Sequence, residues 1–113
     1  MKHEFPCYGE HHGINGSPVP QDNLRLELSP NEFKILSYHH FEIAGFESAK
    51  GGDTLTISFL NHQVRITGKN LRPLALALQE RAVVFIKPVP ARYGLVLEDN
   101  AAVVETIEVE KAE

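Results

Sequence analysis

The chain has 113 residues, 42% hydrophobic and 23% charged, with one cysteine, no tryptophan and a formal net charge of −4. This length fits one domain, the apolar fraction is too high for a disordered chain, and no apolar run approaches the roughly 20 residues that span a bilayer. A single cysteine excludes a scaffold of internal disulfides. The first residues contain no apolar segment of a secretory signal, so we expect a cytoplasmic protein without a membrane partner.

Residues 1–23 contain many turn formers and no hydrophobic period, which predicts an irregular N-terminal arm. The alternative to disorder is docking of the arm through three apolar side chains, Phe5, Tyr8 and Ile14. A single domain is expected over residues 24–110, followed by a solvated tail at 111–113.

The segment Leu24–Leu28 alternates apolar and polar residues, which predicts a half-buried strand. In Ser29–Glu32 a serine can cap a helix, a proline suits the first helical position, and a glutamate follows three residues after the serine. This pattern predicts a short helix at about 30–38. A strand through Phe33–Ile35 is the competing interpretation.

Residues 40–68 have the pattern of an antiparallel meander. Strands are predicted at Phe41–Phe46, Thr54–Phe59 and Gln63–Thr67. In the first strand Phe41 and Ile43 are expected on one face, and Asn61-His62 can form a tight turn between the other two. The residues expected to point inward from the second and third strands are Leu55, Ile57, Phe59, Val64 and Ile66.

The main helix is predicted at about 70–81, where good helix formers follow Asn70 as a possible cap. Its apolar stripe consists of Leu71, Leu74, Ala75, Leu78 and Ala82. The next segment, Val83–Ile86, is apolar on both parities, as in a strand covered on both faces. If this strand and Gln63–Thr67 are parallel in one sheet, the crossover between them is right-handed.

Further strands are predicted at Leu95–Leu97 and Val103–Val109. The fold class is therefore α+β, with a largely antiparallel sheet of five to seven strands that can curl toward a barrel. One main helix cannot cover both faces of such a sheet, so uncovered apolar residues should meet a partner. The residues expected to be uncovered are Val84, Ile86, Val89, Leu95, Leu97 and Val103. We expect a homo-oligomer, and a dimer first because two-fold closure is commonest.

The N-terminal arm contains a candidate metal site. Its four potential ligands, all of which can bind zinc or a similar metal, are His3, Cys7, His11 and His12. In the competing interpretation the arm picks up metal adventitiously, because no paired ligand motif is present.

Cys7 could also act as a nucleophile with His11, His12 or His39 as base, but the chain has no acid–base or nucleophile motif and we do not expect an enzyme.

A second candidate site is cationic, because residues 57–92 carry six cationic side chains against one anionic side chain. An anion could bind where the main helix begins, at Arg65, Gly68, Lys69, Asn70 and Arg72. Nucleic acid could bind the same face together with Lys87, Arg92 and the ring of Tyr93. Ordinary capping of the helix and pairing with the acidic ends of the chain are the competing explanations.

The segment Thr56–Gly68 resembles the central hairpin of Sm-like RNA-binding proteins, with two alternating strands around an Asn turn and a closing Gly. The order of elements differs, because those proteins begin with their helix, and we do not assign the family. The function expected first is non-enzymatic binding or assembly through a sheet face, followed by anion or RNA binding and then by a metal-dependent site.

Overall fold

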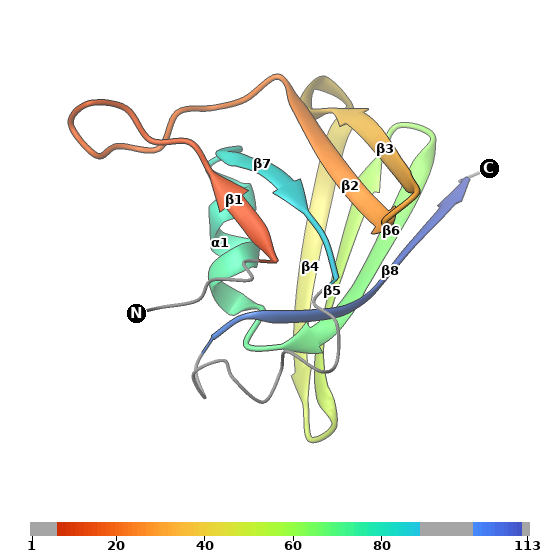
Figure 1. Cartoon of the computed structure of the whole chain (residues 1–113). Coiled ribbons are helices and arrows are strands. Elements are labelled where there is room, and N and C mark those ends of the chain that lie inside the picture. Colours follow the sequence, from red (N-terminus) through yellow and green to blue (C-terminus); the bar gives the residue numbers. More distant parts are fainter. Residues whose placement is uncertain (1–6, 89–100, 112–113) are drawn as a thin grey trace.

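A computed structural model of the chain describes residues 7–88 and 101–111. These residues form two four-stranded sheets, one α-helix and one 3-10 turn (Figure 1). Sheet I has the strand order β1 (Tyr8–Glu10), β7 (Val83–Ile86), β2 (Asn23–Ser29), β3 (Glu32–Ser37). Sheet II has the order β4 (Phe41–Ala49), β5 (Gly52–Phe59), β6 (His62–Lys69), β8 (Val103–Lys111).

The α+β class and the mostly antiparallel pairing are confirmed, since only β2 and β7 pair in parallel. The sheet is divided in two, however, and the described strands do not close into a barrel. β6 and β7 belong to different sheets, so the condition for a right-handed crossover within one sheet is not met. None of the described helices has the length and apolar character needed to cross a membrane.

Part of the N-terminal arm is regular. β1 pairs antiparallel with β7, with Tyr8 opposite Ile86, and Tyr8 packs against the core. Ile14 is fully exposed, so it does not dock the arm, and Phe5 lies outside the described residues. The arm therefore joins the fold through β1. This strand has only three residues, which is too short to show a hydrophobic period in the sequence.

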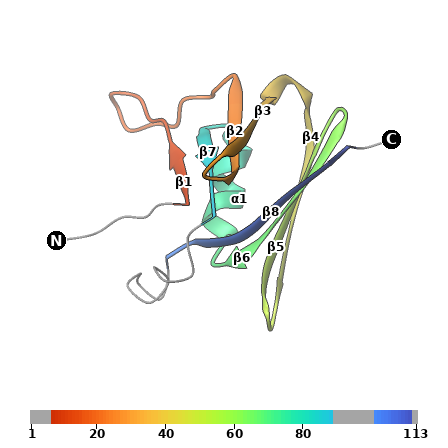
Figure 2. The same cartoon turned by 45° about the vertical axis from the view of Figure 1, so that its right-hand side comes forward.

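The short helix predicted at 30–38 is wrong, and the competing strand is present. β3 pairs with β2, Leu36 opposite Leu24 and Lys34 opposite Leu26. The Ser29 hydroxyl accepts the Asn31 N–H at 3.2 Å, so the residues that resemble a helix start close the turn of a hairpin instead. A 3-10 turn at Tyr38–His40 follows, and the chain passes through this corner into β4 (Figure 1 and Figure 2).

The meander is confirmed as β4–β5–β6, with two local differences. A bulge between Phe41 and Ile43 reverses the side of the strand, so Phe41 packs on the core while Ile43 is 64% exposed. The β5–β6 turn consists of Leu60 and Asn61, one residue earlier than predicted, because Phe59 pairs with His62. All five residues expected to point inward from β5 and β6 are buried.

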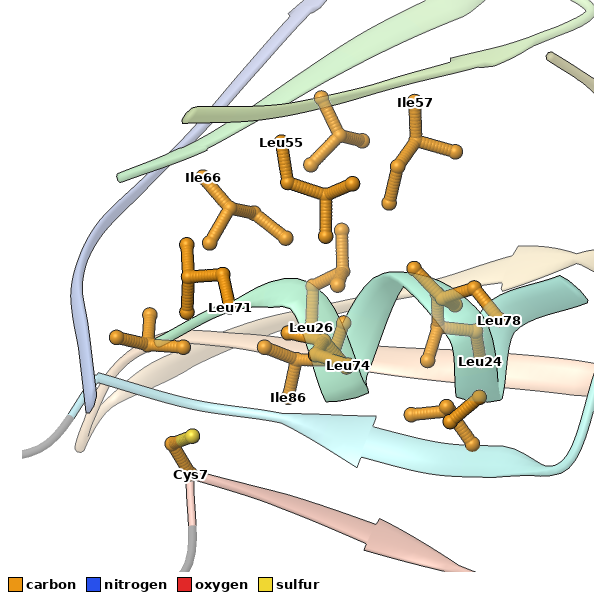
Figure 3. Packing of buried hydrophobic residues seen from close by; sticks show 14 of the residues in the cluster. Cys7, Leu24, Leu26, Leu55, Ile57, Ile66, Leu71, Leu74, Leu78 and Ile86 are labelled. Carbon is orange, nitrogen blue, oxygen red and sulfur yellow. The ribbon is translucent and has the colours of Figure 1, made fainter. Parts of the chain in front are cut away.

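The main helix is confirmed as α1 (Arg72–Gln79). Two buried leucines of α1 and the buried leucine just before it point into the space between the sheets, toward Leu55 and Ile66 on one side and Leu26 and Ile86 on the other (Figure 3). These leucines are Leu71, Leu74 and Leu78. The inner face of each sheet is therefore covered by the other sheet, and α1 fills part of the space between them.

The predicted surplus of apolar residues is found elsewhere. Ile86 is completely buried, and Val84 and Val103 are partly buried. Val89 and the predicted strand Leu95–Leu97 lie outside the described residues. The large apolar side chains left exposed are Ile14, Phe33, Ile35, Ile43, Leu60 and Leu76.

Candidate interaction surface

Three of the four residues predicted to bind metal lie in the described part of the arm. Cys7 is buried, and its thiol donates to the Ala102 carbonyl at 3.5 Å. His11 and His12 are exposed, and His12 Nε2 lies 2.8 Å from Glu10 Oε1. His3 is outside the described residues, and within those residues no group of three or more His, Cys, Asp or Glu side chains could hold a metal ion.

Burial also controls the chemistry of Cys7. Desolvation raises the pKa of its thiol from 9.0 to about 11, so the thiol is protonated at neutral pH. A nucleophilic cysteine requires a lowered pKa and a base within reach. The hydrogen-bond acceptor of this thiol is a backbone carbonyl, and Cys7 packs in the core cluster beside leucines.

We expect the free energy of unfolding to fall as pH rises from about 9 toward about 11, partly because of Cys7. The folded pKa lies above the ordinary value, so the unfolded chain releases its proton first and gains stability relative to the folded chain. Urea denaturation at pH 8 and pH 10.5 measures the loss, which should be smaller in Cys7→Ala. An equal loss in both proteins would contradict the assignment.

The predicted cationic residues that the structure describes are divided between the two sheets. Arg65 lies on the outer side of sheet II, in register with Thr56 on β5 and Glu108 on β8. It lines a depression of about 260 Å³ together with Glu47, Thr54, Thr56, Gln63, Glu108 and Glu110. Three glutamates thus line the same depression as one arginine. Lys87, by contrast, lies over the Phe85 ring on sheet I, and Arg92 and Tyr93 are outside the described residues.

The start of α1 already has a carboxylate. Asp53 Oδ2 accepts the backbone N–H of Leu71 at 3.0 Å, which is the position an external anion would take. Lys69 and Arg72 are exposed beside it, and Asn70 has a positive φ of 56° while its side chain donates to the Ala101 carbonyl. Asp53 gives no local signal of this contact in the sequence, because it lies at the start of β5, eighteen residues before Leu71 along the chain.

Gly68 has a packing role at the same place. A Cβ on Gly68 would lie 1.9 Å from the Val103 carbonyl oxygen, so β8 can approach β6 this closely only beside a glycine. The β6–β8 register shifts at this point, between Thr67 and Gly68. The close contact between these two strands therefore explains the glycine at this position of the predicted anion site.

The outer side of sheet I carries an apolar strip along β3. Phe33 and Ile35 are 59% and 60% exposed, and β3 is the last strand of its sheet. On the neighbouring strands two cations lie over the Phe85 ring, Arg25 at 5.5 Å and Lys87 at 5.7 Å from its centroid. We call Phe33 and Ile35 the β3 strip. The alternation of Phe33-Lys34-Ile35 was its sequence signal, obscured by the helix-start pattern before it.

A groove opens on the other sheet, where its edge strand β4 meets α1. Its volume is about 360 Å³. It is lined by Phe41, Glu42, Ile43, Ala44, Gly45, Phe46, Leu55, Ala75 and Gln79. Most of these side chains are apolar, so the groove extends the core outward at an open edge of the sheet. We call it the β4–α1 groove.

Comparison of this chain with models of known families, with curated proteins and with solved structures found no match.

Proposed function

We propose that this protein is a non-enzymatic association module that forms a homodimer through the β3 strip. The observation that carries the proposal is the exposure of Phe33 and Ile35, two large apolar side chains next to one another on an edge strand. Edge strands that keep apolar side chains exposed promote pairing with another chain. A second copy is the partner to which this surface is always available, and two-fold closure is the commonest arrangement.

The outer side of sheet II makes the contrast clear. Its strands present Thr54, Thr56, Arg65, Glu108 and Glu110, the polar side chains expected where a sheet faces water. On the outer side of sheet I, β3 presents Phe33 and Ile35 in equivalent positions. Phe33 and Ile35 lie two residues apart on one strand, which supports a contact surface there. The other exposed large apolar side chains occur singly on other elements, namely Ile14, Ile43, Leu60 and Leu76.

Substituting both residues of the β3 strip should abolish association. In Phe33→Thr/Ile35→Thr, threonine keeps the preference for strand structure and removes most of the apolar area. Burying about half of each side chain is worth about 1 kcal/mol, so the four side chains of a dimer together account for about two to three decades in Kd. Sedimentation equilibrium between about 1 and 100 µM measures this change against the mass of 12.6 kDa for one chain.

The matched control is Ile14→Thr, which removes an even more exposed apolar side chain from a loop of the arm. This variant should associate like the unsubstituted protein. The proposal is abandoned if the unsubstituted protein is monomeric at 100 µM, or if the double variant dimerises with the same Kd.

A further inference from the structure

We infer that the β4–α1 groove receives β3 of a second copy, with Phe33 and Ile35 toward the groove and Lys34 toward the acidic outer side of sheet II. This inference rests on the proposed function, because it names the surface that the β3 strip meets. It adds that the contact is made by pairing of two edge strands, and that the residues of the β4–α1 groove take part in it.

Both strands have an unused edge. β3 is the last strand of sheet I and β4 is the last strand of sheet II, so along each of them one row of backbone N–H and C=O groups has no neighbouring strand in the described residues. β4 is nine residues long and β3 six, which allows β3 to pair along its whole length. A Cβ on Gly45 would meet nothing within 4 Å, so no described residue lies against β4 at that position.

The apolar side of β3 matches the groove. From β4 the groove presents Phe41, Ala44 and Phe46, and from α1 it presents Ala75. Its 360 Å³ would hold on the order of ten water molecules, so more than one side chain can enter. Phe33 and Ile35 are two residues apart and lie on the same side of β3, the spacing needed for both to reach one groove along a strand.

The polar side of β3 matches the opposite surface. Lys34 lies between Phe33 and Ile35 and therefore points to the other side of the strand. β4 carries Glu42 and Glu47 and no cation, and beside Glu47 the depression on sheet II contains two more glutamates against Arg65. An added strand presents alternate side chains to the two faces of a sheet, so its apolar residues and its lysine meet apolar and acidic surfaces respectively.

The connection between the strands allows both contacts in one interface. β3 and β4 are separated only by the turn Tyr38–His40, so each copy has its strip and its groove on neighbouring parts of the chain. In a two-fold dimer, β3 of each copy can then enter the groove of the other, and the assembly closes at two copies.

The first test places a charge in the groove. Ala44→Lys puts an ammonium group among the apolar side chains of the groove and should raise the dimer Kd about 100-fold or more in sedimentation. Ala49→Lys makes the same change in an exposed residue at the far end of β4 and should alter Kd by less than about threefold.

The second test exchanges charges between exposed residues, which preserves folding. Lys34→Glu alone and Glu47→Lys alone should each weaken the dimer about three- to tenfold. The two changes together should restore Kd to within about twofold, because the pair is reformed with its signs reversed. Lys34→Glu combined with Glu105→Lys, an exposed glutamate on the opposite edge strand β8, should restore nothing.

The outcomes separate this inference from the proposed function. If the β3 strip variant loses association while Ala44→Lys and the charge exchange have no effect, the dimer exists but its second surface is not the groove, and the inference is overturned. A monomeric unsubstituted protein overturns both. Loss of association in Ala44→Lys together with recovery in the Lys34–Glu47 exchange supports the inference.

Discussion

Gly68→Ala is expected to lower the free energy of unfolding by about 3 kcal/mol or more. The added Cβ would lie 1.9 Å from the Val103 carbonyl oxygen and 2.9 Å from its carbonyl carbon. These are backbone atoms, so a side-chain rotation cannot relieve the contact. β8 would have to move away from β6, and their ladder joins eight residue pairs of sheet II. Urea denaturation followed by circular dichroism measures the change.

Gly51→Ala is the matched control for this prediction. A Cβ on Gly51, in the β4–β5 turn, would meet no atom within 4 Å, and we expect a change within about 0.5 kcal/mol. If Gly68→Ala unfolded at the same urea concentration as Gly51→Ala, the close approach of β8 to β6 would be contradicted. A stable Gly68→Ala variant would also reopen a role for Gly68 other than packing.

Local hydrophobic period predicted most of the described elements correctly. Alternation identified β2, β5, β6 and β8, and the leucine stripe identified α1. In each case the residues of the element itself determine which of its faces is buried, so a short stretch of sequence contains the whole hydrophobic pattern. The buried positions on β5, β6 and α1 follow for the same reason.

The errors arise where a distant partner decides the structure. Ser29-Pro30-Asn31-Glu32 suits a helix start and a hairpin turn, and the choice depends on the pairing of Phe33–Ser37 with β2. The division into two sheets depends on β7, which pairs with β2 and β1 across more than fifty residues. Neither pairing can be seen in a local window, so tertiary contacts overrode the local preference.

Contacts between distant parts of the chain also determine the candidate sites. The sequence predicts an oligomer because one helix cannot cover both faces of a sheet, but the inner faces of the two sheets cover one another. Exposed apolar side chains are found on β3 instead, and the side on which Phe33 and Ile35 lie is determined by the pairing of β3 with β2. Asp53 at the start of α1 could not be predicted either, since it is eighteen residues from the N–H group that it accepts.

The largest side-chain effect is expected at the centre of the space between the sheets. Leu74→Ala should lower the free energy of unfolding by about 2–5 kcal/mol. Leu74 is completely buried and points from α1 toward Leu26 and Ile86 of sheet I (Figure 3), so its removal leaves a cavity that both sheets and the helix surround. A change of this size is a large part of the 5–15 kcal/mol typical of a domain.

Leu76→Ala tests the same substitution on the opposite side of α1. Leu76 is 52% exposed, and alanine is the better helix former, so the free energy of unfolding should change by less than about 0.5 kcal/mol. Urea denaturation of the two variants under one set of conditions gives the comparison. Equal losses would mean that α1 presents a different side to the core, and α1 would then no longer explain how the inner faces of the two sheets are filled.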